Sequence, residues 1–180
     1  MLNLEKNFFK KRILIYGLGK SGLSTYNFLK KSNVISLFDD QIINKKKIKD
    51  THTTYKEITK KEFDFIIISP GIDINKCKLS RFLKKNHKKI YTDLDIFYSR
   101  YAFNQKITIT GTNGKSTTAK LLYDILKDQK KDVRLVGNIG NPILLEKKIK
   151  KDTLFVIEAS SYQLEYRKLF KTNISIILNI

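Results

Sequence analysis

The sequence contains one cysteine, two prolines and no tryptophan among its 180 residues. The lone Cys77 excludes an internal disulfide, and with it the disulfide-stapled fold of a small secreted chain. No apolar stretch of signal-peptide length precedes the basic run at residues 10–12, so we expect a cytosolic protein. Apolar runs such as Phe65–Ile68 have the length of a strand, far below the roughly 18 to 20 residues of a membrane span, and we expect no membrane partner.

Acidic residues are also scarce: the chain has 17 of them and 36 basic residues, so the formal net charge is +19. This balance suggests an anionic partner. However, the basic residues are nearly all lysines, scattered in pairs along the whole chain, whereas proteins that read DNA bases usually rely on arginine. We therefore expect a solvated basic surface and no nucleic-acid partner.

Apolar segments of strand length alternate with amphipathic segments of helix length, which is typical of a parallel sheet covered by helices. The pattern predicts the α/β class. Strands are expected at residues 12–16, 34–38, 63–69, 90–91, 106–110, 133–136, 154–157 and 174–178, with a weaker one near 53–55, and helices at 20–31, 76–86, 93–101 and 115–127.

Two glycine-rich turns, at Gly17 and Gly111, each follow a strand and open a helix. Each unit is typical of the start of its own sheet, which predicts a domain boundary near residue 103. We expect a Rossmann-like parallel-sheet domain over residues 1–103, followed over residues 104–180 by the first part of a P-loop ATPase-type α/β domain. The sequence stops directly after an apolar strand, so we also expect that this sheet continues in a longer protein.

The first turn, residues 17–22, reads GLGKSG and is trailed by Asp39, which fits the dinucleotide-binding pattern. Glycines let the backbone approach an anion, and the helix N-terminus offers free N–H groups to a pyrophosphate. Any ligand that contains a nucleotide diphosphate would suit this turn. The alternative interpretation is a tight strand-to-helix turn that binds no ligand.

The second turn is the sharper signal, because it ends as a P-loop does, with Gly-Lys-Ser at the start of a helix. Its backbone can cradle phosphate oxygens, Lys115 can bridge the β- and γ-phosphates, and Ser116 can bind Mg²⁺. The turn therefore predicts use of ATP or GTP. The residues expected to bind the nucleotide are Gly111, Thr112, Asn113, Gly114, Lys115, Ser116 and Thr117.

Glu158 ends the apolar run at residues 153–157, where a carboxylate is costly unless it is paired or bound to a metal. A Mg²⁺ ion bound to phosphates needs a further negative oxygen, usually from the carboxyl end of a neighbouring strand. We expect Glu158 to be that ligand. A salt bridge with one of the many lysines is the alternative interpretation. The small polar segment at residues 159–165 suits a ligand-facing loop.

Taken together, the two turns and four further segments resemble the Mur ligases of peptidoglycan synthesis, and within them the members that add D-glutamate. The matching pieces are GLGKSGLS at 17–24, SPGI at 69–72, DLDIF at 93–97, ITGTNGKST at 109–117, GNIG at 137–140 and EASSYQLE at 158–165. Their order and spacing run through nearly the whole chain.

The resemblance implies that the first turn holds the UDP of a muramyl substrate. In that case Gly19, Lys20 and Ser21 line the diphosphate, and Asp39 and Asp40 face the uracil and ribose. It also implies a role for five more residues. Ser69, Pro70 and Gly71 close the nucleotide pocket, and Asn138 and Ser160 meet the sugar or its peptide arm.

The implied enzyme is an ATP-dependent ligase that joins D-glutamate to UDP-N-acetylmuramoyl-L-alanine through an acyl phosphate. Lys115 and Glu158 would be the catalytic residues, and Ser116 and Glu158 would hold Mg²⁺. Because members of the family are longer, we expect the 180-residue chain to be inactive alone. Two alternatives stay open: a nicotinamide-dependent oxidoreductase, which the first turn allows, and a nucleotide-binding module without catalysis.

Overall fold

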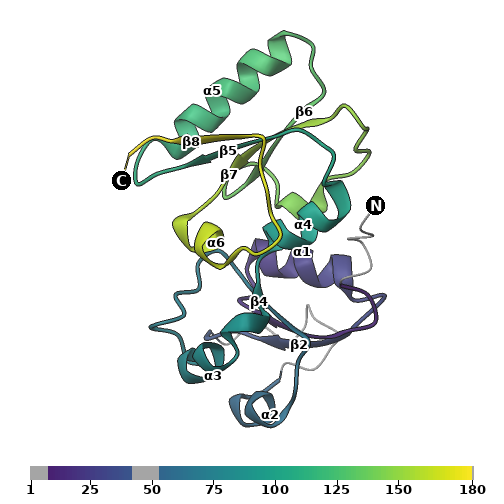
Figure 1. The fold of residues 1–180 in the computed structure, drawn as a ribbon, viewed down its shortest axis with the longest axis vertical. Coiled ribbons are helices and arrows are strands. Elements are labelled where there is room, and N and C mark those ends of the chain that lie inside the picture. The colour runs from purple at the N-terminus through teal and green to yellow at the C-terminus, as the bar shows by residue number, and fades with distance from the viewer. Residues whose placement is uncertain (1–7, 42–52, 180) are drawn as a thin grey trace.

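The computed structural model describes residues 8–41 and 53–179, which form two four-stranded sheets with helices packed against them (Figure 1). The strand orders are β2-β1-β3-β4 and β6-β7-β5-β8, and all pairings between these strands are parallel. The strands are β1 (Arg12–Tyr16), β2 (Val34–Phe38), β3 (Phe65–Ile68), β4 (Ile90–Tyr91), β5 (Lys106–Thr110), β6 (Val133–Gly137), β7 (Leu154–Glu158) and β8 (Ile174–Ile177). The helices are α1 (Lys20–Leu29), α2 (Tyr55–Lys60), α3 (Ser80–Lys85), α4 (Asp93–Tyr101), α5 (Lys115–Asp128) and α6 (Ser161–Tyr166), with short 3₁₀ turns η3 (His87–Lys89) and η4 (Ile143–Leu145). This architecture confirms the predicted α/β class.

The first sheet is organised around β1, whose apolar residues 13–16 are fully buried. Such a strand is covered on both faces, which explains its unbroken apolar sequence. Ile13 and Ile15 belong to the core that α1 and α4 share, whereas Leu14 and Tyr16 pack with residues of α2 and α3. The alternation along one strand thus assigns a helical layer to each face.

In the second sheet, β5 lies between β7 and β8. Ile109 of β5 is fully buried in the same cluster as Ala119 of α5. In the register of β5 and β7, Ile109 pairs with Glu158, the last residue of β7. The carboxyl ends of these two strands therefore meet directly beside the turn that leads into α5.

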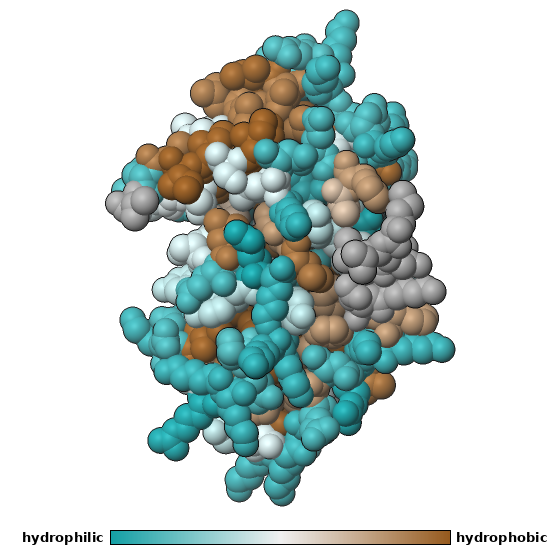
Figure 2. Space-filling model, viewed as in Figure 1, coloured by the Kyte–Doolittle hydropathy of each residue, from teal (hydrophilic) through white to brown (hydrophobic). Residues whose placement is uncertain are grey.

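β8 is an edge strand, and its apolar side chains are exposed: Ile174 by 53% and Ile177 by 64%. Leu121 and Ile125 on α5 are exposed by 60% and 47%. Figure 2 shows hydrophobic side chains gathered over α5 and along β8, whereas hydrophilic side chains cover most of the half that holds the first sheet. An exposed strand edge with apolar side chains is prone to self-association.

Two expectations about local structure in the first half of the chain are wrong. The weak strand near residues 53–55 is the start of α2, because Thr54 and Glu57 form a reciprocal capping box. The helix expected at residues 76–86 is shortened to α3, since the backbone N–H groups of Lys76 and Cys77 both turn back to the Asp73 carbonyl. In the first case, the Thr-x-x-Glu spacing was a readable helix-start signal.

The two sheets share one hydrophobic core and several polar contacts. Phe97 of α4 packs edge-on against Phe155 of β7, with ring centroids 4.8 Å apart. Asp95, also on α4 and fully buried, accepts hydrogen bonds from the backbone N–H groups of residues 168–170. Lys106, at the start of β5, donates to the carbonyls of Tyr101, Ala102 and Asn104 and so caps the end of α4. The predicted boundary near residue 103 falls in this connection, and the division into two domains stays a prediction.

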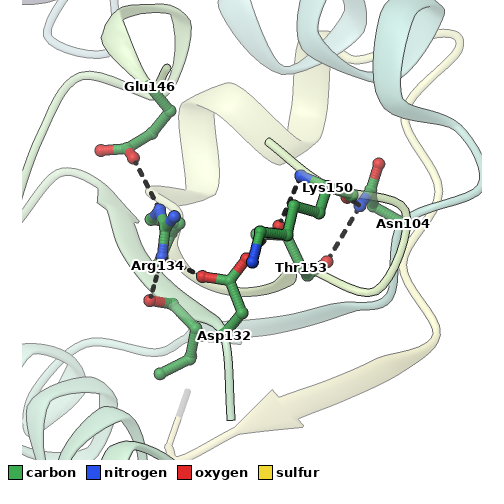
Figure 3. Close-up of polar contacts among 7 residues, drawn as sticks. Asn104, Asp132, Arg134, Glu146, Lys150 and Thr153 are labelled. Carbon is green, nitrogen blue, oxygen red and sulfur yellow. Dashed lines mark hydrogen bonds and ion pairs between the residues drawn. The ribbon is translucent and has the colours of Figure 1, made fainter. Parts of the chain in front are cut away.

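A polar network connects the amino ends of β6 and β7 (Figure 3). Asp132 accepts hydrogen bonds from Thr153 Oγ1, at 2.6 Å, and from Arg134, whose Nε lies 3.4 Å from Glu146. The Thr153 hydrogen bond, with a smaller contribution from Arg134, lowers the pKa of Asp132. Asn104 donates to the carbonyl oxygens of Lys150 and Thr153, which ties the α4–β5 connection to the loop before β7. These contacts are structural, since they lie at the amino ends of the strands.

No helix among the described residues combines the length and the apolar character that crossing a membrane requires.

Candidate functional site

The second glycine turn lies between β5 and α5, with Gly114 as the helix N-cap and Lys115 as the first helical residue. The Lys115 ammonium folds back over the turn and donates to the carbonyl oxygens of Gly111, at 2.6 Å, and Thr112, at 2.9 Å. The side chain is half-buried, so its charge sits at the mouth of the turn. A polyanion at this turn would meet both the ammonium and the N-terminal end of a 14-residue helix.

Asn179, two residues beyond the end of β8, also contacts this turn. Its Oδ1 accepts hydrogen bonds from the backbone N–H groups of Thr112, at 2.8 Å, and Asn113, at 2.9 Å. Its Nδ2 donates to the Asn113 carbonyl. The amide oxygen thus occupies two of the donors that phosphate oxygens use in a P-loop. The sequence analysis missed Asn179, although a polar residue at the end of an apolar strand next to the turn was a usable signal.

Ser116 and Glu158 come together at the head of α5. The Ser116 hydroxyl donates to Glu158 Oε2 at 2.8 Å, and Glu158 is 4% exposed. None of the ion pairs within 4.0 Å among the described residues includes Glu158, so the alternative of a salt bridge with lysine is not supported.

Gly137 lets β6 approach this carboxylate. A Cβ at Gly137, which has φ +107°, would lie 2.1 Å from the Glu158 carbonyl oxygen. The next backbone N–H, that of Asn138, donates to the same oxygen at 3.0 Å. The close packing and this hydrogen bond join the end of β6 to the backbone of Glu158, from which the carboxylate extends.

Mg²⁺ prefers oxygen ligands and commonly binds through one or two protein groups plus substrate phosphates. The hydroxyl of Ser116 and the carboxylate of Glu158 match this preference. In the described part of the chain, no group of three or more His, Cys, Asp or Glu residues could hold a metal ion. The donor set therefore fits a Mg²⁺ ion carried by a nucleotide and does not provide a complete protein cage.

The first glycine turn is held closed by contacts from neighbouring strand ends. Gly22 of α1 packs so closely on the turn that a Cβ there would lie 1.8 Å from the Gly17 carbonyl oxygen. That oxygen accepts a hydrogen bond from Ser69 Oγ at 2.6 Å. The Leu18 N–H donates to Asp39 Oδ2 at 2.5 Å. Ser69 and Asp39, both expected to contact substrate, thus also shape the turn.

Asp40 is engaged within the protein. It accepts hydrogen bonds from the Tyr16 hydroxyl, at 2.5 Å, and from the Lys78 backbone N–H, at 3.3 Å. Burial raises the pKa of Tyr16, and the hydrogen bond to Asp40 adds to the rise. The expected role of Asp40 toward the uridine stays a prediction.

The other expected substrate residues lie at the same ends of the strands. Gly19, Lys20 and Gly71 are exposed, Pro70 is half-buried, and Asn138 is exposed at the end of β6. Ser160 is the N-cap of α6 and forms a reciprocal hydrogen-bond pair with Gln163, so residues 161–165 of the segment expected as a loop at 159–165 are helical. The Ser-x-x-Gln spacing is again the signal that sequence reasoning missed.

Ser21 contacts a residue that the sequence analysis did not select. Its hydroxyl donates to Asp93 Oδ2 at 2.5 Å, across 72 residues of sequence. The other carboxylate oxygen of Asp93 accepts from Gln163 Nε2 at 2.9 Å. Burial raises the pKa of Asp93, and these two hydrogen bonds oppose the rise. The first turn, α4 and α6 therefore meet at one buried carboxylate.

A cavity of about 370 Å³ lies between β5, β8 and the segment that follows α6. Its wall includes Thr108, Thr110, Arg167 and Lys171. None of the expected site residues lines this cavity. The chemistry of the two turns, and not this cavity, therefore defines the candidate site.

Comparison with known domains gives two matches. Residues 11–90 match the Mur ligase MurD-like N-terminal domain, and residues 109–180 match the Mur ligase middle domain. Among solved structures, the chain is similar in fold to a UDP-N-acetylmuramate:L-alanyl-gamma-D-glutamyl-meso-diaminopimelate ligase from Neisseria meningitides. The TM-score is 0.54 at 14% identity, over 94% of this chain and 60% of that one. At this identity, the likeness concerns the fold alone.

Curated relatives named UDP-N-acetylmuramoylalanine–D-glutamate ligase align with nearly the whole chain. The Rickettsia bellii protein is 34% identical over 95% of this chain and 38% of its own length. The Wolbachia pipientis protein is 38% identical over 99% of this chain and 36% of its own, and the Buchnera aphidicola protein 40% identical over 98% and 41%. The chain thus spans about two fifths of the length of these relatives.

Proposed function

The chain carries the N-terminal and middle domains of the Mur ligase family, and we propose that it forms part of the cytoplasmic ligase that joins D-glutamate to UDP-N-acetylmuramoyl-L-alanine. The observation that carries this proposal is the Ser116–Glu158 pair, 2.8 Å apart at the head of the Lys115 helix. A hydroxyl, a carboxylate and an ammonium around one glycine turn suit a magnesium nucleotide.

In the proposed reaction, the free carboxylate of the L-alanyl residue attacks the γ-phosphate of ATP and gives an acyl phosphate and ADP. The amine of D-glutamate then attacks the acyl carbon, and phosphate leaves as the amide forms. Phosphoryl transfer of this kind depends mainly on positioning and on neutralising charge.

The chain's own groups supply that positioning at the second turn. Residues 111–114 wrap the β-phosphate, and Thr117 lies in the first turn of α5 beside them. Lys115, which now donates to the carbonyls of the turn, exchanges these acceptors for phosphate oxygens and neutralises the transferring group. Ser116 and Glu158 would hold Mg²⁺, which shields the charge of the phosphates when it is bound.

At the first turn, the proposed ligand is the UDP end of the muramyl substrate. Gly19, Lys20 and Ser21 lie at the exposed start of α1, where backbone N–H groups and a lysine suit a diphosphate. Asp39 and Asp40 directly follow β2 and are assigned to the uridine, and residues 69–71 close the pocket. Asn138 and Ser160, which flank Glu158, are assigned to the sugar or its peptide arm.

Ligand titration tests this assignment. UDP-N-acetylmuramoyl-L-alanine, Mg·ATP and NADH are titrated separately into the protein and followed by calorimetry. We expect the first two ligands to bind and NADH not to bind. Binding of NADH without binding of the UDP substrate would favour an oxidoreductase and overturn the ligase proposal.

We further propose that residues 1–180 alone do not complete the reaction, because the chain spans about two fifths of relatives that are named as ligases. An assay with ATP, D-glutamate and the UDP substrate measures this directly. Formation of the D-glutamyl amide at a rate typical of an enzyme would contradict it.

A further inference from the structure

A ligase of the proposed kind has to align two ligands that different sheets hold. The acceptor carboxylate reaches the γ-phosphate only if the first turn, which carries the UDP end, keeps a fixed orientation to the Ser116–Glu158 pair. Reacting atoms have to approach within about 3 to 3.5 Å, so an error of about 1 Å between the sheets is costly. Apolar packing between the sheets is not directional, whereas hydrogen bonds are.

One buried carboxylate supplies such a directional link. Asp93 is 3% exposed, and its two oxygens accept from the Ser21 hydroxyl of α1 and the Gln163 side chain of α6. Gln163 is 2% exposed, and its own Oε1 accepts from the Ser160 N–H at 3.1 Å. Ser160 is two residues beyond Glu158, so an unbroken series of contacts connects the first turn to the proposed metal ligand.

The chemistry of the link is specific. Both side-chain donors to Asp93 are uncharged, so hydrogen bonds rather than an ion pair compensate its burial. The neighbouring Asp95 joins α4 to the backbone of residues 168–170, whereas Asp93 is the residue that contacts Ser21 and Gln163. A buried carboxylate with neutral partners is unfavourable for stability alone, which points to a role in specifying geometry.

We propose that Asp93 is a positioning residue that couples the UDP site on the first turn to the magnesium-nucleotide site at Ser116 and Glu158. The coupling rests on the proposed function, since it presupposes both ligands. A diphosphate on the first turn holds the Ser21 side chain in one orientation. Through its hydrogen bonds, Asp93 then holds Gln163 in place, and Gln163 in turn holds Ser160 and the end of β7. Each ligand then binds to a protein that the other has already ordered.

The matched variants are Asp93→Asn, Gln163→Glu and the two combined. Asp93→Asn keeps the shape but leaves one acceptor oxygen, so the contacts to Ser21 and Gln163 cannot both be kept in their present form. Gln163→Glu places two carboxylates face to face. In the combined variant, the amide introduced at position 93 donates to the carboxylate introduced at position 163. This exchange restores the contact with its polarity reversed, and a glutamate at the N3 position of α6 still completes the capping box.

The measurement is the affinity for Mg·AMP-PNP with and without saturating UDP-N-acetylmuramoyl-L-alanine, by calorimetry, on the 180-residue chain and the three variants. We expect the UDP substrate to tighten Mg·AMP-PNP binding at least about fivefold in the parent chain. Each single variant should reduce that factor to about one, while each ligand measured alone changes less than about threefold. The combined variant should recover most of the factor.

The outcomes separate this proposal from the proposed function. If the parent chain binds both ligands without coupling, or if the single variants keep the coupling, the role of Asp93 is overturned and the ligase assignment stands. Failure of the combined variant to recover the coupling, with both ligands still bound, likewise overturns it. If the parent chain binds neither ligand, both proposals fail.

Discussion

The two glycine turns have similar sequences and positions but differ in what holds them. At the first turn, a serine and an aspartate from neighbouring strand ends bind its backbone: Ser69 donates to Gly17, and Asp39 accepts from Leu18. At the second turn, the contacts come from an ammonium and an amide, those of Lys115 and Asn179. The partners of the first turn bind its backbone through a serine and an aspartate, whereas those of the second turn are a cation and an amide whose contacts a phosphate could replace under the proposed function. Two glycine turns of similar sequence thus differ in the groups that surround them, and these groups decide which anion each turn would suit.

The largest effect is expected on stability, from a side chain added at Gly22, where the first turn packs against α1. Gly22→Ala places a Cβ 1.8 Å from the Gly17 carbonyl oxygen, and backbone on both sides has to move. We expect the free energy of unfolding to fall by about 2 to 4 kcal/mol in chemical denaturation. The matched control is Gly71→Ala, because no atom lies within 4 Å of a Cβ there. Equal stability of the two variants would contradict the close packing of the turn.

At the second turn, Lys115→Ala should weaken Mg·ATP binding about 100-fold, because a charge-assisted contact to phosphate contributes about 3 kcal/mol. Binding of the UDP substrate to the first turn should be unchanged. Lys120→Ala is the control, since that lysine lies on the same helix and pairs with Asp124 at the surface. An unaltered ATP affinity in the Lys115 variant would favour a nucleotide-binding module without P-loop chemistry.

A smaller effect is expected for Glu158→Gln, which retains an acceptor for Ser116 but removes the charge. We expect the affinity for Mg·ATP to fall about tenfold and the affinity for metal-free ATP to stay nearly constant. Titrations at several Mg²⁺ concentrations measure this, with Asp124→Asn as the exposed control on α5. If the Mg²⁺ dependence is the same in parent and variant, Glu158 does not bind the ion.

The smallest effect concerns the connection between the two regions. Burial lowers the pKa of Lys106 from its ordinary value of 10.5 to about 8. Between these values the unfolded chain binds more protons than the folded one, so the free energy of unfolding should rise with pH across the window from about 8 to 10.5. The change in the free energy of unfolding is complete only at pH values above 10.5, the pKa of Lys106 in the unfolded chain. Denaturation at pH values of about 8 and about 9.5 should show a rise that is smaller in Lys106→Met, and an equal slope in both proteins would contradict the shift.

Much of the fold was readable from local patterns. The strands at 12–16, 34–38 and 106–110 agree with the structure, because a short segment rich in β-branched and other apolar residues, ended by a glycine turn or by an acidic pair, is a strong signal for a buried parallel strand. The six-residue helices α2 and α6 were missed, since they are too short to show a periodic apolar face. Their capping boxes were the only local signal of a helix start.

The candidate site was predictable in part. Ser116 and Glu158 could be paired from the sequence, because the carboxyl ends of parallel strands share one edge of a sheet. Asp93 and Asn179 could not be selected in the same way. Asp93 meets partners 72 and 70 residues away, and Asn179 meets a turn 67 residues away, so only the packing of the complete chain brings them together.

By itself, the sequence determined the α/β class, the two glycine turns and the matches to the N-terminal and middle domains of Mur ligases, because these depend on short-range spacing and on motifs. The tertiary structure alone decided which groups contact the turns, where α6 begins, and that the buried carboxylate of Asp93 connects α1 to α6. Such contacts depend on directional hydrogen bonds between distant segments, and no local pattern of residues encodes the orientation of one sheet to the other.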